Sequence, residues 1–83
     1  MKKILIYTTT ICPYCVRAKA LLTRKGFSYE EINANDDKTR DEMIKKSGGM
    51  RTVPQIFIGD QHIGGCDELY ALEKEGKLDQ LVK

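Results

Sequence analysis

Apolar residues first gather near the start of the chain, in the run Lys3–Tyr7, where β-branched and aromatic side chains predominate. A short apolar run without alternation is typical of a strand that is buried on both faces. From Pro13 onward the apolar residues recur at helical spacing instead, at Cys15, Ala18, Leu21 and Leu22. Pro13 is suited to begin this helix, and Gly26 to end it. The pattern therefore predicts a buried strand followed by an amphipathic helix.

The middle of the chain predicts a second strand and a second helix. The segment Phe27–Asn33 alternates imperfectly but contains enough aromatic and β-branched residues for a strand. A loop is expected at Asn35–Asp37. Thr39 and Glu42 have the spacing of a capping box, and the helix that they would start runs to Ser47.

The last third of the chain predicts a hairpin and two further helices. The runs Gln55–Ile58 and Gln61–Ile63 flank a Gly-Asp pair, which is typical of an antiparallel hairpin. Asp67 can cap a helix through Glu75, and apolar spacing within Leu78–Val82 indicates a short terminal helix. The order β-α-β-α-β-β-α predicts an α/β sandwich. Its mixed sheet would be parallel in the first half and antiparallel in the second, with helices on both faces.

Composition narrows the class of protein. With 83 residues, of which 41% are hydrophobic and 31% charged, the chain is expected to form one soluble globular domain, residues 1–83. No segment approaches the roughly 20 apolar residues of a membrane span. The apolar run Ile4–Tyr7 is too short for a signal peptide. A net charge of +2 is too balanced to indicate nucleic acid. We therefore expect neither a membrane nor a nucleic acid as partner.

The chain has three cysteines, and two of them, Cys12 and Cys15, form a CxxC pair after the first predicted strand. An odd number does not fit a secreted disulfide scaffold and favours a reducing compartment, the cytoplasm. The pair has three interpretations. A zinc site would need more ligands, and only His62 and Cys66 could supply them, without a second compact knuckle. A structural disulfide would close a very small loop with little entropic gain and would be reduced in the cytosol.

Redox chemistry fits the position of the pair better. A CxxC at the turn from a strand into a helix, within a βαβ pattern, is typical of thiol-disulfide exchange. Cys12 would face the unpaired N–H groups and the positive end of the helix dipole, which stabilise a thiolate and lower its pKa. Cys15, one turn further along the apolar stripe, is expected to stay protonated until needed. This interpretation predicts Cys12 as the nucleophile and Cys15 as the resolving thiol.

Three motifs in this order resemble those of dithiol glutaredoxins in the thioredoxin superfamily: CPYC at 12–15, TVPQIFI at 52–58 and IGGCDEL at 63–69. The resemblance covers nearly the whole chain. The absence of tryptophan argues against thioredoxins and disulfide isomerases, which have a WCxxC form. The resemblance implies a thioredoxin fold with a four-stranded mixed sheet, and a glutathione-dependent thiol-disulfide oxidoreductase.

The resemblance also implies which residues bind glutathione: Tyr14, Arg40, Thr52, Val53, Pro54, Gly65, Cys66 and Asp67. Val53-Pro54 would be a cis peptide, although the sequence alone favours trans, and the Val53 backbone would pair with the cysteine part of glutathione. Gly64 and Gly65 would let the chain approach a ligand closely. Asp67 and nearby helix N–H groups would hold the γ-glutamyl group; a plain N-cap is the simpler role for Asp67, and the two roles are compatible.

Several of these positions have simpler alternatives. Tyr14 would flank the glutathione sulfur or be a solvent-facing filler. Arg40 would contact a glutathione carboxylate or be a solvated helix residue. Cys66 is expected to contribute its backbone rather than a reactive thiol, and His62 to be only an exposed side chain.

One position departs from the family pattern. Many members carry a lysine three residues before the first cysteine, where it pairs with the glycine carboxylate of glutathione, and this chain has Thr9. A threonine hydroxyl offers one neutral hydrogen bond in place of a charge-assisted contact. We therefore expect weaker glutathione binding than in lysine-bearing relatives.

The predicted enzyme reduces protein disulfides and glutathione mixed disulfides through Cys12 and Cys15, with glutathione as reducing co-substrate and no metal. It would be a monomer, and its partners would be disulfide-bearing or glutathionylated proteins, with ribonucleotide reductase implied by the resemblance alone. Two alternatives stay open: a small redoxin reduced by thioredoxin reductase, and a dimer that binds an iron-sulfur cluster through Cys12 and glutathione. Pro13 and Cys15 disfavour the second, since relatives specialised for clusters usually have CGFS.

Overall fold

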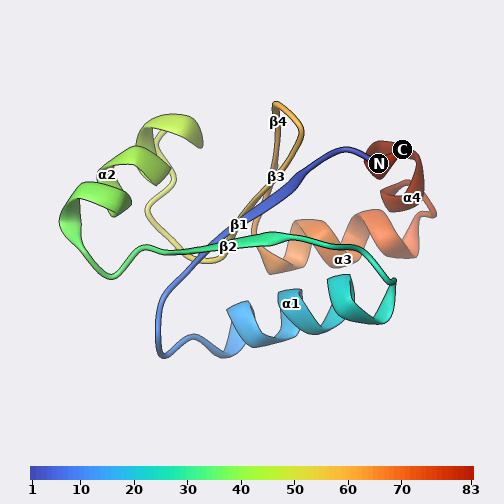
Figure 1. Ribbon diagram of the computed structural model, residues 1–83, viewed down its shortest axis with the longest axis horizontal. Coiled ribbons are helices and arrows are strands. Elements are labelled where there is room, and N and C mark those ends of the chain that lie inside the picture. Colours follow the sequence, from blue (N-terminus) through green and yellow to red (C-terminus); the bar gives the residue numbers. More distant parts are fainter.

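The computed structural model describes all of residues 1–83. Four strands and four helices follow one another along the chain (Figure 1): β1 (Ile4–Thr8), α1 (Pro13–Arg24), β2 (Glu30–Asn33), α2 (Asp37–Lys46), β3 (Gln55–Ile58), β4 (Gln61–Gly64), α3 (Cys66–Lys74) and α4 (Leu78–Val82). This is the order that the apolar pattern predicts, including the short terminal helix.

The strands form one mixed sheet in the order β2-β1-β3-β4. β1 runs parallel to β2, with Leu5 opposite Glu30, and antiparallel to β3, with Leu5 opposite Phe57. β3 and β4 form the predicted hairpin, with an irregular register between Ile56 and Phe57. β1 and β3 are therefore the central strands, which explains why their side chains are buried almost throughout.

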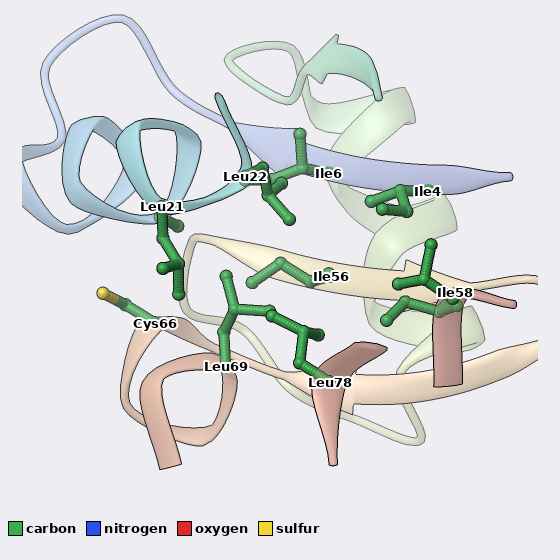
Figure 2. Close-up of a cluster of buried hydrophobic side chains, with 11 residues drawn as sticks. Ile4, Ile6, Leu21, Leu22, Ile56, Ile58, Cys66, Leu69 and Leu78 are labelled. Atoms are coloured by element: carbon green, nitrogen blue, oxygen red, sulfur yellow. The ribbon is translucent and has the colours of Figure 1, made fainter. Parts of the chain in front are cut away.

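Helices cover both faces of this sheet (Figure 1), as predicted. The larger core lies between the sheet and α1, α3 and α4, and Figure 2 shows side chains from β1, β3, α1 and α3 directed toward one another. A smaller core on the opposite face packs α2 against the sheet through Tyr7, Ala34, Met43 and Phe57. Cys66 lies at the margin of the larger core (Figure 2), close to the start of α3.

The start of α1 is set by Cys12 and Pro13. Cys12 has extended backbone angles (φ −153°, ψ 98°) and is the N-cap, while Pro13 occupies the first turn, where its missing N–H is not needed. The predicted apolar stripe of this helix is buried: Cys15, Ala18, Leu21 and Leu22. Packing of this stripe holds the end of the helix that carries both thiols.

Two element boundaries differ from the prediction. β2 lacks the residues before Glu30; Phe27 and Tyr29 are instead half-buried against the larger core. α2 starts within the expected loop because Asp36, rather than Thr39, is its N-cap. The Asp36 carboxylate accepts a hydrogen bond from the Thr39 N–H at 2.9 Å, and this bond lowers the pKa of Asp36.

The two ends of the chain lie side by side, away from the start of α1 (Figure 1). Lys2 N–H donates to the carbonyl oxygen of Val82 at 2.6 Å. No helix here has the length and apolar character that crossing a membrane requires.

Candidate active site

Cys12 and Cys15 are joined by a disulfide at the start of α1, and their Cα atoms are 5.2 Å apart. Cys12 is partly exposed, whereas Cys15, one turn along the helix, is only 1% exposed. A large disulfide substrate can therefore reach Cys12 and cannot reach Cys15 directly.

The surroundings of Cys12 Sγ favour a negative charge on this atom. It accepts a hydrogen bond from the backbone N–H of Cys15 at 3.1 Å, so that the sulfur itself caps the helix. The other free N–H groups of the first turn add the positive end of the helix dipole. In the reduced protein this arrangement stabilises a thiolate at Cys12, which is the form that attacks disulfides.

The segment before β3 passes close to this sulfur. Cys12 Sγ lies 3.8 Å from the carbonyl oxygen of Val53. The Val53-Pro54 peptide is cis, which confirms what the family resemblance implies rather than what the sequence alone favours. Pro54 is buried and Val53 is half-buried, and the Val53 backbone adjoins Cys12.

A pocket of about 240 Å³ opens beside Val53. Three separate segments line it: the first turn of α1, the TVP segment and the start of α3. The lining residues are Tyr14, Thr52, Val53, Pro54, Gly65, Cys66, Asp67 and Glu68. Seven of the eight implied glutathione-binding residues thus lie together here, and Arg40 is not among those that line the pocket.

Two glycines, Gly64 and Gly65, lie where the chain enters α3 and comes close to Glu68 and to the TVP segment. A Cβ on Gly65 would lie 3.3 Å from the carbonyl oxygen of Pro54, tighter than an ordinary contact. Gly64 has a φ of +119°, and a Cβ there would lie 2.7 Å from Glu68 Oε1. Contacts within the protein therefore favour glycine at both positions, and more strongly at Gly64, where the backbone conformation also favours it.

Glu68 is a pocket residue that the sequence interpretation missed. Its Oε1 accepts a hydrogen bond from the Gly65 N–H at 2.7 Å, and Gly65 is the N-cap of α3. The prediction that Asp67 caps this helix is therefore wrong, and Asp67 lies in the first turn with its exposed side chain at the pocket. The signal was the spacing of Gly65 and Glu68, which matches the N-cap and N3 positions of a capping box.

Cys66 is a free thiol at the first position of α3 and is 6% exposed. Burial raises the pKa of this thiol most; Arg17 opposes the shift, while Asp67 and Glu68 add to it. A raised pKa keeps the thiol protonated at neutral pH, and the protonated form is a poor nucleophile. This environment agrees with the expectation that Cys66 serves through its backbone.

Tyr14, Arg40 and His62 have different surroundings. Tyr14 is 55% exposed and lines the pocket. The Arg40 side chain is exposed, and its Nε donates to the carbonyl oxygen of Ala34 at 3.3 Å. His62 is half-buried, with Nε2 2.7 Å from Gln55 Oε1, so its interpretation as only an exposed side chain is wrong.

The residues considered for a zinc site are not brought together. Cys12 and Cys15 are bonded to each other, Cys66 is buried at the core margin and His62 contacts Gln55. The structure contains no group of three or more His, Cys, Asp or Glu residues that could hold a metal ion.

Known proteins with similar sequences and structures identify the family of this chain. The protein-family model described as Glutaredoxin matches residues 4–63, which include the thiol pair and the TVP segment. The chain belongs to the glutaredoxin family. Glutaredoxin 3 of Escherichia coli (strain K12) is 60% identical to it, with 100% of both chains covered. The solution structure of glutaredoxin from Brucella melitensis is 58% identical, has a TM-score of 0.88, and is matched over 100% of this chain and 90% of that one.

A third relative is a buckwheat glutaredoxin-glutathione complex, whose crystal structure is 32% identical with a TM-score of 0.85, covering 95% of this chain and 74% of that one. These similarities confirm the thioredoxin fold with its four-stranded mixed sheet. This glutaredoxin is a glutathione-dependent thiol-disulfide oxidoreductase of the dithiol, CPYC type, and Cys12 and Cys15 are its cysteine pair.

Proposed function

We propose that this glutaredoxin reduces glutathione mixed disulfides and protein disulfides with Cys12 as the attacking thiolate and Cys15 as the resolving thiol. One observation carries the proposal: Cys12 Sγ is the N-cap acceptor of α1, 3.1 Å from the Cys15 N–H and 3.8 Å from the Val53 carbonyl oxygen. The partly exposed Cys12 meets the substrate first, and the buried Cys15 acts afterwards.

A glutathione mixed disulfide requires only Cys12. The Cys12 thiolate attacks the glutathione sulfur, a Cys12-glutathione disulfide forms, and the substrate leaves as a thiolate that takes up a proton. The thiolate of a second glutathione then attacks the sulfur of the bound one, which restores the Cys12 thiolate. In sum, the mixed disulfide and one glutathione become the substrate thiol and glutathione disulfide, and no step uses a metal.

A protein disulfide requires both thiols. Cys12 attacks one substrate sulfur and forms a mixed disulfide, releasing the first substrate thiol. Cys15 then attacks Cys12 Sγ, releases the second substrate thiol and leaves the Cys12-Cys15 disulfide, the bond present in this structure. Two glutathione molecules reduce that bond and depart as glutathione disulfide.

The pocket suits glutathione bound as an extended peptide. We place its cysteine part along the backbone of Thr52, Val53 and Pro54, as an added strand with its sulfur beside Cys12. Tyr14 would form one wall of the sulfur position.

The γ-glutamyl end of glutathione would lie at the start of α3. Its carboxylate would accept hydrogen bonds from the first-turn N–H groups of Cys66 and Asp67, because that of Gly65 already donates to Glu68, and its ammonium would meet the Asp67 carboxylate. The glycine end would extend beyond the pocket, where the exposed Arg40 on α2 is the proposed cation. Many relatives have a second cation, a lysine, at the position of Thr9.

Protein substrates would approach over an apolar rim around Cys12. Ile11, Tyr14 and Val16 are 90%, 55% and 62% exposed and flank the thiol in the sequence. Such exposed apolar side chains suit a protein segment that carries a disulfide or a glutathionylated cysteine. The proposed partners are such proteins, including ribonucleotide reductase, acted on by a monomer in the cytoplasm, where glutathione keeps thiols reduced.

Single-thiol variants test the assignment of Cys12 and Cys15. Cys12→Ser should lose turnover of both a glutathionylated peptide and a protein disulfide. Cys15→Ser should keep the first activity and lose the second, and after reaction with glutathione disulfide its mass should rise by one glutathionyl group. Ala20→Ser, on the exposed side of α1, is the control. Appreciable turnover by Cys12→Ser would show that the nucleophile is assigned wrongly.

A further inference from the structure

A buried glutamine lies directly after the cis-proline and takes no part in the chemistry described above. Gln55 is 0% exposed, although β3 is otherwise lined by apolar side chains. Its side-chain Nε2 donates to the carbonyl oxygen of Thr52 at 2.9 Å and lies 3.2 Å from Thr52 Oγ1. Gln55 thus folds back onto the segment that precedes its own strand.

His62 completes this contact from the neighbouring strand. His62 Nε2 lies 2.7 Å from Gln55 Oε1, and the imidazole packs against Phe57 with ring centroids 5.0 Å apart. The direction of the chain of hydrogen bonds follows from its end at Thr52. A backbone carbonyl can only accept, so Gln55 Nε2 is the donor, Oε1 is the acceptor, and the imidazole proton lies on Nε2.

The chain of hydrogen bonds ends beside the reactive sulfur. Thr52 is exposed and Val53 is half-buried. Both lie in a loop, so no strand pairing holds them in place. Val53 follows Thr52 in the chain, and its carbonyl oxygen lies 3.8 Å from Cys12 Sγ. Gln55 is fully buried and its Oε1 is paired with His62 Nε2, so removal of the imidazole would leave this oxygen without a hydrogen bond.

We propose that Gln55 is a positioning residue for glutathione, held in place by His62. Through Thr52 it fixes the backbone edge of Val53 at the distance and angle that an extended peptide needs. The inference rests on the proposed binding of glutathione along Val53. Neither Gln55 nor His62 lines the pocket, and both act through Thr52.

Steady-state kinetics with a glutathionylated peptide test the inference at a temperature well below unfolding. Gln55→Met keeps the size of the side chain and removes its hydrogen bonds. We expect KM for the peptide to rise about tenfold, the equivalent of about one hydrogen bond, with kcat changed less than about twofold. Gln61→Met, on the exposed side of β4, is the matched control and should leave both constants unchanged.

Variants of His62 provide a second, independent arm. His62→Phe keeps a ring against Phe57 but has no donor for Gln55, so KM should rise in the same direction. His62→Gln can place an amide donor near the position of Nε2 and so form the same kind of hydrogen bond with Gln55. Its KM should therefore stay within about twofold of wild type. A merely structural role would lower stability in both variants without this difference in KM.

The outcomes separate this inference from the function on which it rests. No turnover of the glutathionylated peptide by the wild type would overturn both. Turnover by the wild type with an unchanged KM in a folded Gln55→Met would overturn only the positioning role. If Gln55→Met does not fold, equal KM values for His62→Phe and His62→Gln would overturn it just as well.

Discussion

Gly64 lies so close to the side chain of Glu68 that a Cβ on Gly64 would force one of the two to shift. A Cβ at Gly64 would come within 2.7 Å of Oε1, 2.9 Å of Cγ and 3.1 Å of Cβ of Glu68. The same carboxylate accepts the N–H of Gly65 at 2.7 Å. Gly64 therefore makes room for the side chain that caps α3, and the φ of +119° is a second reason for glycine there.

Gly64→Ala should consequently destabilise the protein and disturb the pocket. The strained backbone alone is expected to lower the free energy of unfolding by about 1–3 kcal/mol, and the clash with Glu68 adds to this. Urea denaturation measures the loss. Gly76→Ala is the matched control, because its φ is +75° but a Cβ there would meet nothing within 4 Å. Equal losses at both positions would mean that the contact with Glu68 does not matter.

Thr9→Lys should strengthen glutathione binding. A lysine at this position offers the glycine carboxylate a charge-assisted bond, worth about 1.5–3 kcal/mol in favourable geometry. The expected result is a KM for glutathione that is about tenfold lower. Ser28→Lys adds the same charge between α1 and β2, away from Cys12, and controls for a general electrostatic effect. A KM that is the same in Thr9→Lys and wild type would reject the idea that Thr9 weakens binding.

Cys66 should react slowly with alkylating reagents until the pH is well above neutral. Burial raises its pKa, so the thiolate fraction at pH 7–8 is smaller than for a free cysteine, whose pKa is about 8.5. Iodoacetamide labelling of a Cys12→Ser/Cys15→Ser variant isolates this thiol. The rate should be much lower in the folded protein than in urea at the same pH. Equal folded and unfolded rates would contradict the burial seen here.

Glu31 should contribute a small stabilisation that disappears in acid. Lys19 and then Thr8 lower the pKa of its carboxyl, through contacts of 2.9 Å and 2.7 Å to Oε2. Because the folded pKa lies below the ordinary value of 4.5, the stabilisation is present above that value and is lost as the pH falls through the folded pKa.

The variant Glu31→Gln should therefore be less stable than wild type at pH 7. The difference is expected to be below about 1 kcal/mol, because the Lys19-Glu31 pair is partly exposed to water. Urea denaturation from pH 7 downward should show it shrinking below pH 4.5. Glu42→Gln, an exposed carboxylate on α2, is the control. A difference that persists in acid would assign the effect to packing rather than to charge.

Strong periodic signals in the sequence predict most of the fold. The apolar run of β1 and the stripe of α1 are unambiguous because burial alone decides them. Capping is harder to predict, since Asp36-Thr39 and Thr39-Glu42 both have a suitable spacing. The choice depends on which residue adopts extended backbone angles, and here that residue is Asp36 (φ −82°, ψ 152°).

The candidate site likewise has one part that the sequence predicts and another that it does not. The chemistry of Cys12 and Cys15 follows from their spacing and from their position at a helix start, which the apolar periodicity and Pro13 together indicate. The partners of Gln55 and Glu68 depend on how a hairpin and a helix meet the TVP segment in three dimensions. A buried glutamine in an apolar strand indicates that it has hydrogen-bond partners, but the sequence does not identify them as Thr52 and His62.

In the proposed mechanism, the atom that caps α1 is also the atom whose bonding changes in every catalytic cycle. The Cys15 N–H donates to Cys12 Sγ, and a thiolate accepts such a bond more strongly than a neutral sulfur does. Opening of the first helical turn should then be rarest when Cys12 is reduced and ionised. The hydrogen-exchange rate of one backbone amide would therefore report the oxidation state of the enzyme without any added label.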